Sequence, residues 1–428
     1  MKDSTAALAA RHIWPPYTPI ERWEAEPVPV VESADHIYLT TQDGRRLIDA
    51  VGSWWVSNLG HGYPRVRDAL HAQLDRMPHV AAAGLTHPPA ATLASRLAAA
   101  APGGLERVFY SDNGSTAVEV AVRAAFQFWQ QQGHPEKRVF VSLDGAYHGD
   151  TIGAVSVGGI ATFHDRFAPL LFERLAAPTP SRVGEDASLR ALDALLQEHG
   201  ARVAALVIEP LVQGAAGMCM HSPAYLKAVA ERCRAHDVLL IADEVFVGFG
   251  RTGTLFACEQ AGVEPDFLCL SKGLTAGMLP FAATLATARV YDGFRGEGHT
   301  FYYGHSYCGN PLGCVAALAV LDAFEQDGVL ENVAERGAQL GAWLERQAGR
   351  EGVHEVRRTG LIGAIQLGTS SAYTADIGWA VYRAALERGA YLRPLGNVIY
   401  MVPALTIRED ELDALLAIVD ESLSVALA

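Results

Sequence analysis

A lysine and an aspartate each come at the end of a short apolar run. Lys272 follows the apolar residues 267–270, and Asp243 follows the apolar residues 238–242. A partly dehydrated lysine has a lowered pKa that suits Schiff-base chemistry with a carbonyl group. A buried carboxylate can keep the ring nitrogen of a cofactor protonated. Taken singly, the lysine is more often an amine that reaches solvent and the aspartate a helix cap or ion-pair partner.

The elements that would position these two residues are short strands separated by helices. Apolar runs predict strands at residues 107–110, 138–143, 203–208, 238–242 and 267–270. The apolar face of residues 115–132 predicts a helix between the first two strands. Continuous apolar strands that alternate with helices indicate a mainly parallel α/β sheet with helices on both faces.

Polar residues follow all five of these strands. They are residues 111–115, 144–150, Glu209, 243–244 and 271–273. Ligands of open parallel sheets bind beyond the carboxyl ends of the strands. The five clusters therefore predict a single site at one edge of the sheet.

Two of these clusters carry further candidate ligand contacts. Gly114 and Ser115 open the predicted helix, where free backbone N–H groups and a partial positive charge favour a phosphate. Tyr147 lies in a loop beside glycines and could stack on a planar ring. Taken singly, the serine is more often an ordinary helix cap and the tyrosine a simple packing residue.

Composition limits the classes of partner. The formal net charge of −14 argues against nucleic acid and anionic membrane surfaces, which bind basic patches. No run of eighteen apolar residues occurs, so we expect no membrane span. The six cysteines lack zinc-site spacing, and residues 1–11 do not resemble a signal peptide. We therefore expect a cytoplasmic protein with reduced thiols and no metal site.

The chain is expected to form two domains. Residues 1–59 contain a predicted hairpin around Asp43-Gly44 and form an N-terminal arm with part of a small domain. Residues 60–325 form the large α/β domain, and residues 326–428 the C-terminal small domain.

Six motifs together resemble the class III aminotransferases, which have fold type I and depend on pyridoxal 5'-phosphate (PLP). They are Asn113-Gly-Ser115, Tyr147-His-Gly-Asp150, Ile241-Ala-Asp-Glu-Val245, Gly248-Phe-Gly-Arg-Thr-Gly253, Leu270-Ser-Lys-Gly-Leu-Thr275 and Gly309-Asn-Pro311. The resemblance implies a large PLP-binding domain with a mainly parallel sheet. It also implies a smaller α+β domain built from the N- and C-terminal segments.

The resemblance also implies roles for individual residues. Lys272 would carry PLP, Asp243 would face the pyridine nitrogen, and Tyr147 would stack on the ring. Gly114 and Ser115 would bind the phosphate, together with Ser306 from the second subunit of a homodimer. The substrate pocket would contain Tyr17, Trp54, Tyr147, Lys272, Arg393 and Tyr400, with catalytic roles for Lys272, Asp243 and Tyr17.

Within the class, three further stretches resemble the members that aminate 8-amino-7-oxononanoate in biotin biosynthesis. They are residues 12–18, 53–55 and 393–400. This resemblance implies S-adenosylmethionine as amino donor, with Arg393 holding a substrate carboxylate in a two-pronged contact. His305-Ser306-Tyr307 instead resembles the members that use lysine as donor. The sequence also leaves open an ω-amino acid or diamine aminotransferase, and a PLP-binding protein without catalysis.

Overall fold

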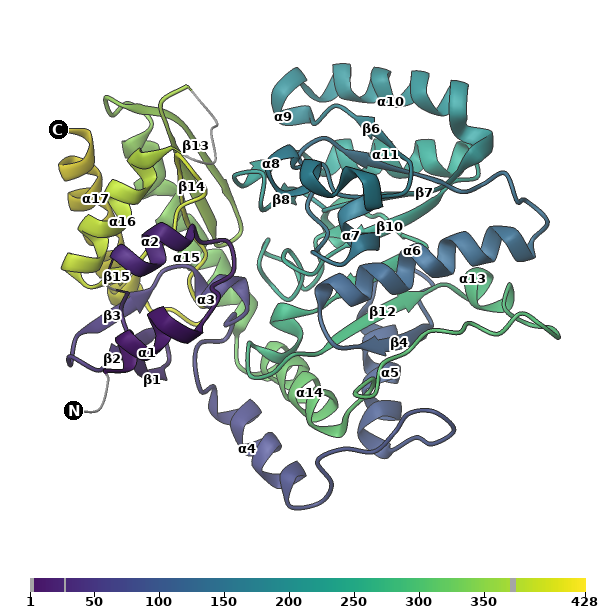
Figure 1. Cartoon of the computed structure of the whole chain (residues 1–428), viewed down its shortest axis with the longest axis horizontal. Helices are drawn as coiled ribbons and strands as arrows, with labels where there is room; N and C mark the ends of the chain where they lie inside the picture. Colours follow the sequence, from purple (N-terminus) through teal and green to yellow (C-terminus); the bar gives the residue numbers. More distant parts are fainter. Residues whose placement is uncertain (1–3, 27, 370–374) are drawn as a thin grey trace.

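The computed structural model describes residues 4–26, 28–369 and 375–428. A seven-stranded sheet forms the centre of the larger part of the molecule (Figure 1). Its strands, in spatial order, are β4 (Arg107–Ser111), β12 (Ala282–Ala286), β11 (Phe267–Leu270), β10 (Leu239–Asp243), β7 (Val203–Ile208), β5 (Val139–Leu143) and β6 (Arg174–Ala177).

The sheet is mainly parallel, as the sequence predicts. β10 pairs in parallel with β11 and β7, and β5 pairs in parallel with β7 and β6. β12 is antiparallel to both of its neighbours, β11 and β4. β12 and β6 were not predicted from the sequence, whereas the five predicted strands are present with shifts of at most one residue at either end.

Alternate residues of the strands point to opposite faces, and each face is covered by helices. Leu239 and Ile241 of β10 belong to the apolar cluster formed with α6 (Gly114–Gln131), α7 (Ile152–Ser156) and α13 (Ala288–Asp292). Leu240 and Ala242 pack on the other face, in the larger cluster. The helices of that cluster include α4 (Pro64–Leu74), α5 (Pro88–Ala100), α10 (Glu185–His199), α11 (Pro223–Ala235) and α14 (Pro311–Gln326).

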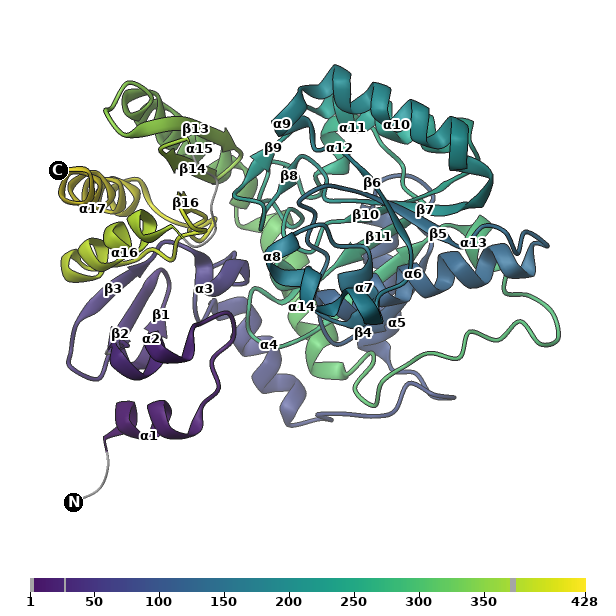
Figure 2. The ribbon, with the colours of Figure 1, turned by 45° about the horizontal axis from the view of Figure 1, so that its top comes forward.

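The second part of the molecule joins segments from the two ends of the sequence (Figure 2). β1 (Val31–Asp35), β2 (Tyr38–Thr41) and β3 (Arg46–Asp49) form an antiparallel unit, which contains the predicted hairpin. β15 (Ala390–Tyr391) pairs in parallel with β3. The N- and C-terminal segments therefore share one sheet, whereas the predicted domain boundaries stay a prediction.

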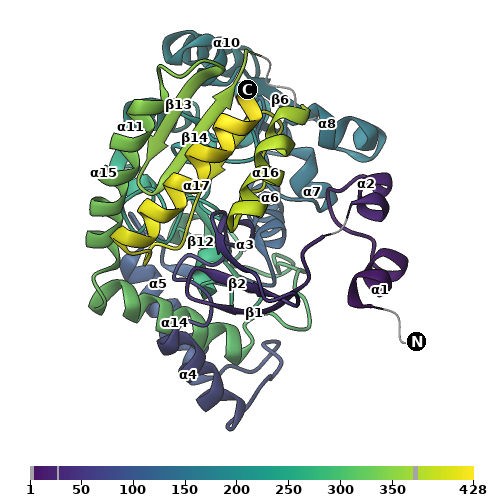
Figure 3. The ribbon, with the colours of Figure 1, turned by 90° about the vertical axis from the view of Figure 1, so that its left-hand side faces the viewer.

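A three-stranded antiparallel sheet and three long helices complete this part (Figure 3). The strands are β13 (Val353–Thr359), β14 (Ile362–Leu367) and β16 (Val398–Met401), and the helices are α15 (Val329–Gln347), α16 (Asp376–Arg388) and α17 (Glu409–Leu427). Two short helices, α1 (Thr5–His12) and α2 (Ile20–Ala25), lie at the N-terminal end. None of the helices in the described part of the chain is long and apolar enough to cross a membrane.

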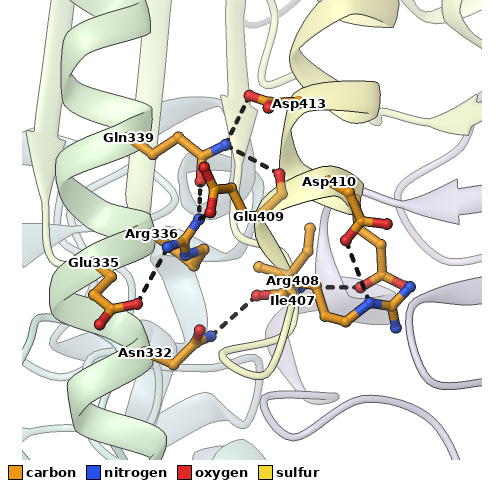
Figure 4. Close-up of polar contacts among 10 residues, drawn as sticks. Asn332, Glu335, Arg336, Gln339, Ile407, Arg408, Glu409, Asp410 and Asp413 are labelled. Atoms are coloured by element: carbon orange, nitrogen blue, oxygen red, sulfur yellow. Dashed lines mark hydrogen bonds and ion pairs between the residues drawn. The ribbon is translucent and has the colours of Figure 1, made fainter.

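Polar contacts fix α15 against the segment that leads into α17 (Figure 4). Asn332 Nδ2 donates to the carbonyls of Leu405 and Ile407, at 2.7 and 3.0 Å. Gln339 Nε2 donates to the carbonyl of Glu409 and to Asp413 Oδ1. The bonds of Asn332 satisfy two carbonyls that precede α17, and the bonds of Gln339 hold the first turn of that helix in place.

Candidate active site

A cavity of about 700 Å³ lies where the polar clusters follow the strands of the large sheet. It is lined by residues that come after β5, β7, β10 and β11 and by the start of α6. The predicted site residues that line it are Tyr17, Trp54, Gly114, Ser115, Tyr147, Asp243 and Lys272. Glu209 and Asp150 line it as well. The sheet thus brings the five clusters to one edge.

Lys272 begins the turn that follows β11 and presents its amine to the cavity. Its Nζ lies 4.5 Å from the ring centroid of Trp55 and 5.6 Å from that of Phe246. Burial lowers the pKa of Lys272 to about 8, against the opposing effect of nearby carboxylates that include Asp243. Its backbone is left-handed, with a φ of 44°, which is costly for a residue with a Cβ. Local strain and a lowered pKa at one lysine are typical of a functional group.

Asp243 ends β10 and is held at both carboxylate oxygens. Oδ2 lies 2.8 Å from His148 Nδ1, and Oδ1 accepts the N–H of Val245 at 3.1 Å. Both side chains of the Asp243–His148 pair are buried. The carboxylate therefore has a fixed orientation beside the cavity. No role was predicted for His148 from the sequence, although it follows Tyr147 in the predicted polar cluster 144–150.

Two tyrosines share one carboxylate at the cavity wall. Tyr17 Oη donates to Asp150 Oδ1 at 2.5 Å, and Tyr147 Oη donates to Asp150 Oδ2 at 2.7 Å. Burial and the hydrogen bonds of Tyr147 with Tyr17 and with Asp150 raise the pKa of Tyr147 and keep its hydroxyl protonated. Asp150 also received no role from the sequence; its place in the cluster 144–150 was the signal that could have found it.

The start of α6 offers a cradle for an anion. Asn113 caps the helix by accepting the N–H of Thr116, so the free N–H groups of the first turn remain at the end of the helix. A Cβ on Gly114 would lie 2.6 Å from Val245 Cγ1, so only glycine fits there without a shift. Ser115 Oγ accepts the N–H of Asp150 at 3.0 Å.

Glu209 supports the loop that carries Tyr147. Its Oε1 accepts the N–H of Tyr147 at 3.1 Å, and its Oε2 accepts the N–H of Gly214 at 2.9 Å. Burial raises the pKa of Glu209 to about 7. The side chain therefore holds the loop of Tyr147 in place.

Three of the predicted site residues are not among the residues that line this cavity. Arg393 lies beside it, with its guanidinium 5.2 Å from the ring of Trp54 and its Nη2 donating to the carbonyl of Tyr17. Tyr400 is buried behind Trp55, at a ring separation of 6.0 Å. Ser306 is exposed on the surface, and its predicted role concerns the site of a second subunit.

Comparison with known proteins identifies the family. The family model for class III aminotransferases matches residues 20–423. The chain belongs to the class III aminotransferases.

Close relatives within this family share one name. Adenosylmethionine-8-amino-7-oxononanoate aminotransferase of Geobacter sulfurreducens is 47% identical, over 96% of this chain and 96% of the relative. The protein of the same name from Nitratidesulfovibrio vulgaris is 43% identical, over 96% of this chain and 79% of the relative. The crystal structure of the same enzyme from Methanocaldococcus jannaschii superimposes with a TM-score of 0.94 at 36% identity, covering 98% of each chain.

Class III aminotransferases are PLP-dependent, and the residues of this cavity fit that cofactor. PLP carries an aldehyde, a ring nitrogen and a phosphate. The amine of Lys272, the buried carboxylate of Asp243 and the cradle at Gly114 supply one matching partner for each. The enzyme is thus an α/β aminotransferase of fold type I.

Proposed function

We propose that this enzyme transfers an amino group from S-adenosylmethionine to 8-amino-7-oxononanoate and forms 7,8-diaminononanoate, a step in biotin biosynthesis. The observation that carries the proposal is the 47% identity, over nearly the whole of both chains, to a relative that is named for this reaction. The cavity of about 700 Å³ supports it, because a long aliphatic acceptor needs an apolar enclosure.

The proposed roles divide the cavity into a cofactor region and a substrate region. PLP, when bound, supplies an electron sink for the carbon that loses a proton. Lys272 holds the cofactor through its aldehyde and afterwards moves the proton as a general acid and base. Asp243, oriented by His148, keeps the ring nitrogen protonated. Tyr147 packs on the ring, and Gly114 and Ser115 bind the phosphate.

The substrate region is formed by aromatic walls and one cation. Tyr17 and Trp54 are in edge contact, with ring centroids 5.7 Å apart, and enclose the aliphatic chain. Arg393, at the side of the cavity next to Trp54, pairs with the carboxylate of the acceptor. Tyr400 supports this wall from behind through Trp55.

We infer a homodimer in which Ser306 of each chain reaches the phosphate in the site of the other. Its exposure leaves its hydroxyl open to a second subunit. The cytoplasmic location stays a prediction from the sequence.

Turnover with defined donors tests the proposal. The purified, PLP-loaded protein is incubated with 8-amino-7-oxononanoate and one donor at a time, and 7,8-diaminononanoate is measured by mass spectrometry. We expect product with S-adenosylmethionine and none from Lys272→Ala. The surface variant Lys227→Ala, which is exposed on α11, is the matched control and keeps full activity. Product with lysine but not with S-adenosylmethionine would identify lysine as the amino donor. No product with either donor would refute the biotin-pathway assignment.

An amine or ω-amino acid aminotransferase is the second candidate. It is favoured by the similarity to an (S)-enantioselective omega-transaminase from Thermomicrobium roseum, with a TM-score of 0.94 at 30% identity, covering 99% of this chain and 98% of the other. Rapid deamination of β-alanine or putrescine, together with inactivity toward 8-amino-7-oxononanoate, would establish it.

A further inference from the structure

The guanidinium of Arg393 lies beside two indole rings. Its Cζ is 5.2 Å from the ring centroid of Trp54 and 5.8 Å from that of Trp379. Both distances fall within the range of cation–π attraction. Trp54 lines the cavity, whereas Trp379 comes from α16, outside the lining. The two indoles make no ring contact with each other among the described residues, so Arg393 is the group that links them.

The other contacts of Arg393 leave its positive charge unbalanced. Nη2 donates to the carbonyl of Tyr17 at 3.1 Å, and the Arg393 side chain also hydrogen-bonds the Tyr391 side chain. Both acceptors are neutral. The described residues include no carboxylate in an ion pair with Arg393. A planar guanidinium held by aromatic rings keeps several N–H donors in its plane for a two-pronged contact. Arg393 is therefore arranged to bind a carboxylate from outside the chain.

Trp379 also contacts the N-terminal segment that carries Tyr17. Arg22, on α2, lies with its Cζ 4.4 Å from the ring centroid of Trp379, and its Nη2 is 3.6 Å from Asp376 at the start of α16. Tyr382 packs edge-on against the indole at 5.2 Å. The indole of Trp379 is thus fixed on several sides. It contacts both the guanidinium of Arg393 and the N-terminal segment that carries Tyr17.

We propose that Trp379 is a positioning residue for carboxylate recognition, holding Arg393 in place together with Trp54. The inference rests on the proposed function, because it takes the carboxylate of the acceptor as the ligand of Arg393. Without the indole, the long side chain of Arg393 must be ordered when substrate binds, which weakens binding. The proton-transfer groups around Lys272 are not affected, because Trp379 does not line their cavity.

The test compares an acceptor that carries the carboxylate with one that lacks the charge. Steady-state kinetics of the PLP-loaded enzyme are measured with 8-amino-7-oxononanoate and with its methyl ester. We expect Trp379→Leu to raise the KM of the acid about tenfold. The KM of the ester and kcat stay near those of the parent enzyme. Trp379→Phe, which keeps an aromatic ring, restores most of the affinity for the acid.

A double-variant comparison separates positioning from a general structural role. In an Arg393→Ala background, Trp379→Leu is expected to have no further effect on the KM of the acid. Equal losses with acid and ester, or an undiminished effect in that background, would overturn the proposal. Should Trp379→Leu fail to fold, Trp379→Met provides a flexible apolar side chain without a ring.

A binding measurement keeps this inference separate from the proposed function. If the parent enzyme does not turn over 8-amino-7-oxononanoate, the proposed function fails. Calorimetric titration of the PLP-loaded protein with nonanoate, and with nonanamide as the uncharged control, then tests Trp379 directly. Weaker binding of nonanoate alone to the Trp379→Leu variant supports the positioning role, and unchanged binding refutes it.

Discussion

Lys272 illustrates how a single side chain acquires reactivity from its surroundings. Burial beside Trp55 and Phe246 disfavours the ammonium form, and the carboxylates of Asp243 and Glu209 partly oppose this effect. The result is a pKa of about 8 in place of the usual 10.5. About a tenth of the amine is neutral at pH 7, compared with fewer than about one in a thousand for an ordinary lysine.

The rate at which the protein without cofactor captures PLP is expected to rise with pH through a midpoint near 8. The neutral amine is the nucleophile, so the rate follows its fraction, which increases as pH rises through the pKa of Lys272. The increase in PLP absorbance after mixing, measured from pH 6 to pH 9, gives the midpoint. A rate that still rises in proportion to hydroxide between pH 8 and pH 9 would show that the pKa of Lys272 is not lowered.

Among elements, the start of α6 is a tightly packed part of the site. Gly114 contacts Val245, and the N–H of Val245 donates to Asp243. The phosphate cradle and the carboxylate at the ring nitrogen are therefore mechanically linked. A substitution that displaces the start of α6 is therefore expected to displace Val245 and, with it, the carboxylate of Asp243 at the end of β10.

Gly114→Ala is expected to weaken PLP binding at least tenfold and to lower the free energy of unfolding by about 1–3 kcal/mol, as overpacking does. The added methyl would lie 2.6 Å from Val245 Cγ1 and would force a shift of that residue. Gly104→Ala is the matched control, because its methyl would meet no atom within 4 Å. PLP titration and thermal melting measure both effects. Identical behaviour of the two variants would contradict the cradle.

The left-handed turn at Ser53, Trp54 and Trp55 is a second element that the site depends on. Their φ angles are 44°, 67° and 73°, in a region that side chains with a Cβ rarely adopt. Ser53 Oγ donates to Asp49 Oδ2 at 2.7 Å, which ties the turn to the end of β3. This turn places Trp54 in the lining of the cavity and Trp55 beside the amine of Lys272.

Across the whole molecule, the cavity is made from segments that lie far apart in the chain. Tyr17, from the N-terminal segment, meets Asp150 after β5, and Arg393, near the C-terminus, meets Tyr17. The proposed homodimer extends this arrangement to a second chain through Ser306.

Coexpression of two inactive variants is expected to restore activity if Ser306 acts across the dimer. Lys272→Ala removes the amine, and Ser306→Asp places a negative charge against the phosphate. A mixed dimer contains two sites, one of which has both parental residues, so the purified mixed dimer regains about half of the parental activity. Turnover of the copurified, differently tagged chains measures it. A mixture that stays inactive would place Ser306 outside the site of the partner.

The large sheet and the position of the site within it follow from the order of residues along the chain. Apolar runs marked five strands, and the polar residues after them marked one edge, because the carboxyl ends of parallel strands meet there. β12 was missed because it is antiparallel and rich in alanine, a residue more typical of helices. β6 is short and followed a segment with no clear periodicity.

Which side chains meet depends on tertiary packing. The contacts of His148 with Asp243, of Tyr17 with Asp150 and of Trp379 with Arg393 join residues from different elements. Periodicity reports the face on which a residue lies, but it carries no information about the partner that long-range packing brings to that face. The left-handed turn at residues 53–55 could also not be predicted from the sequence. Residues with a Cβ adopt this conformation only where the surrounding packing outweighs their local backbone preference.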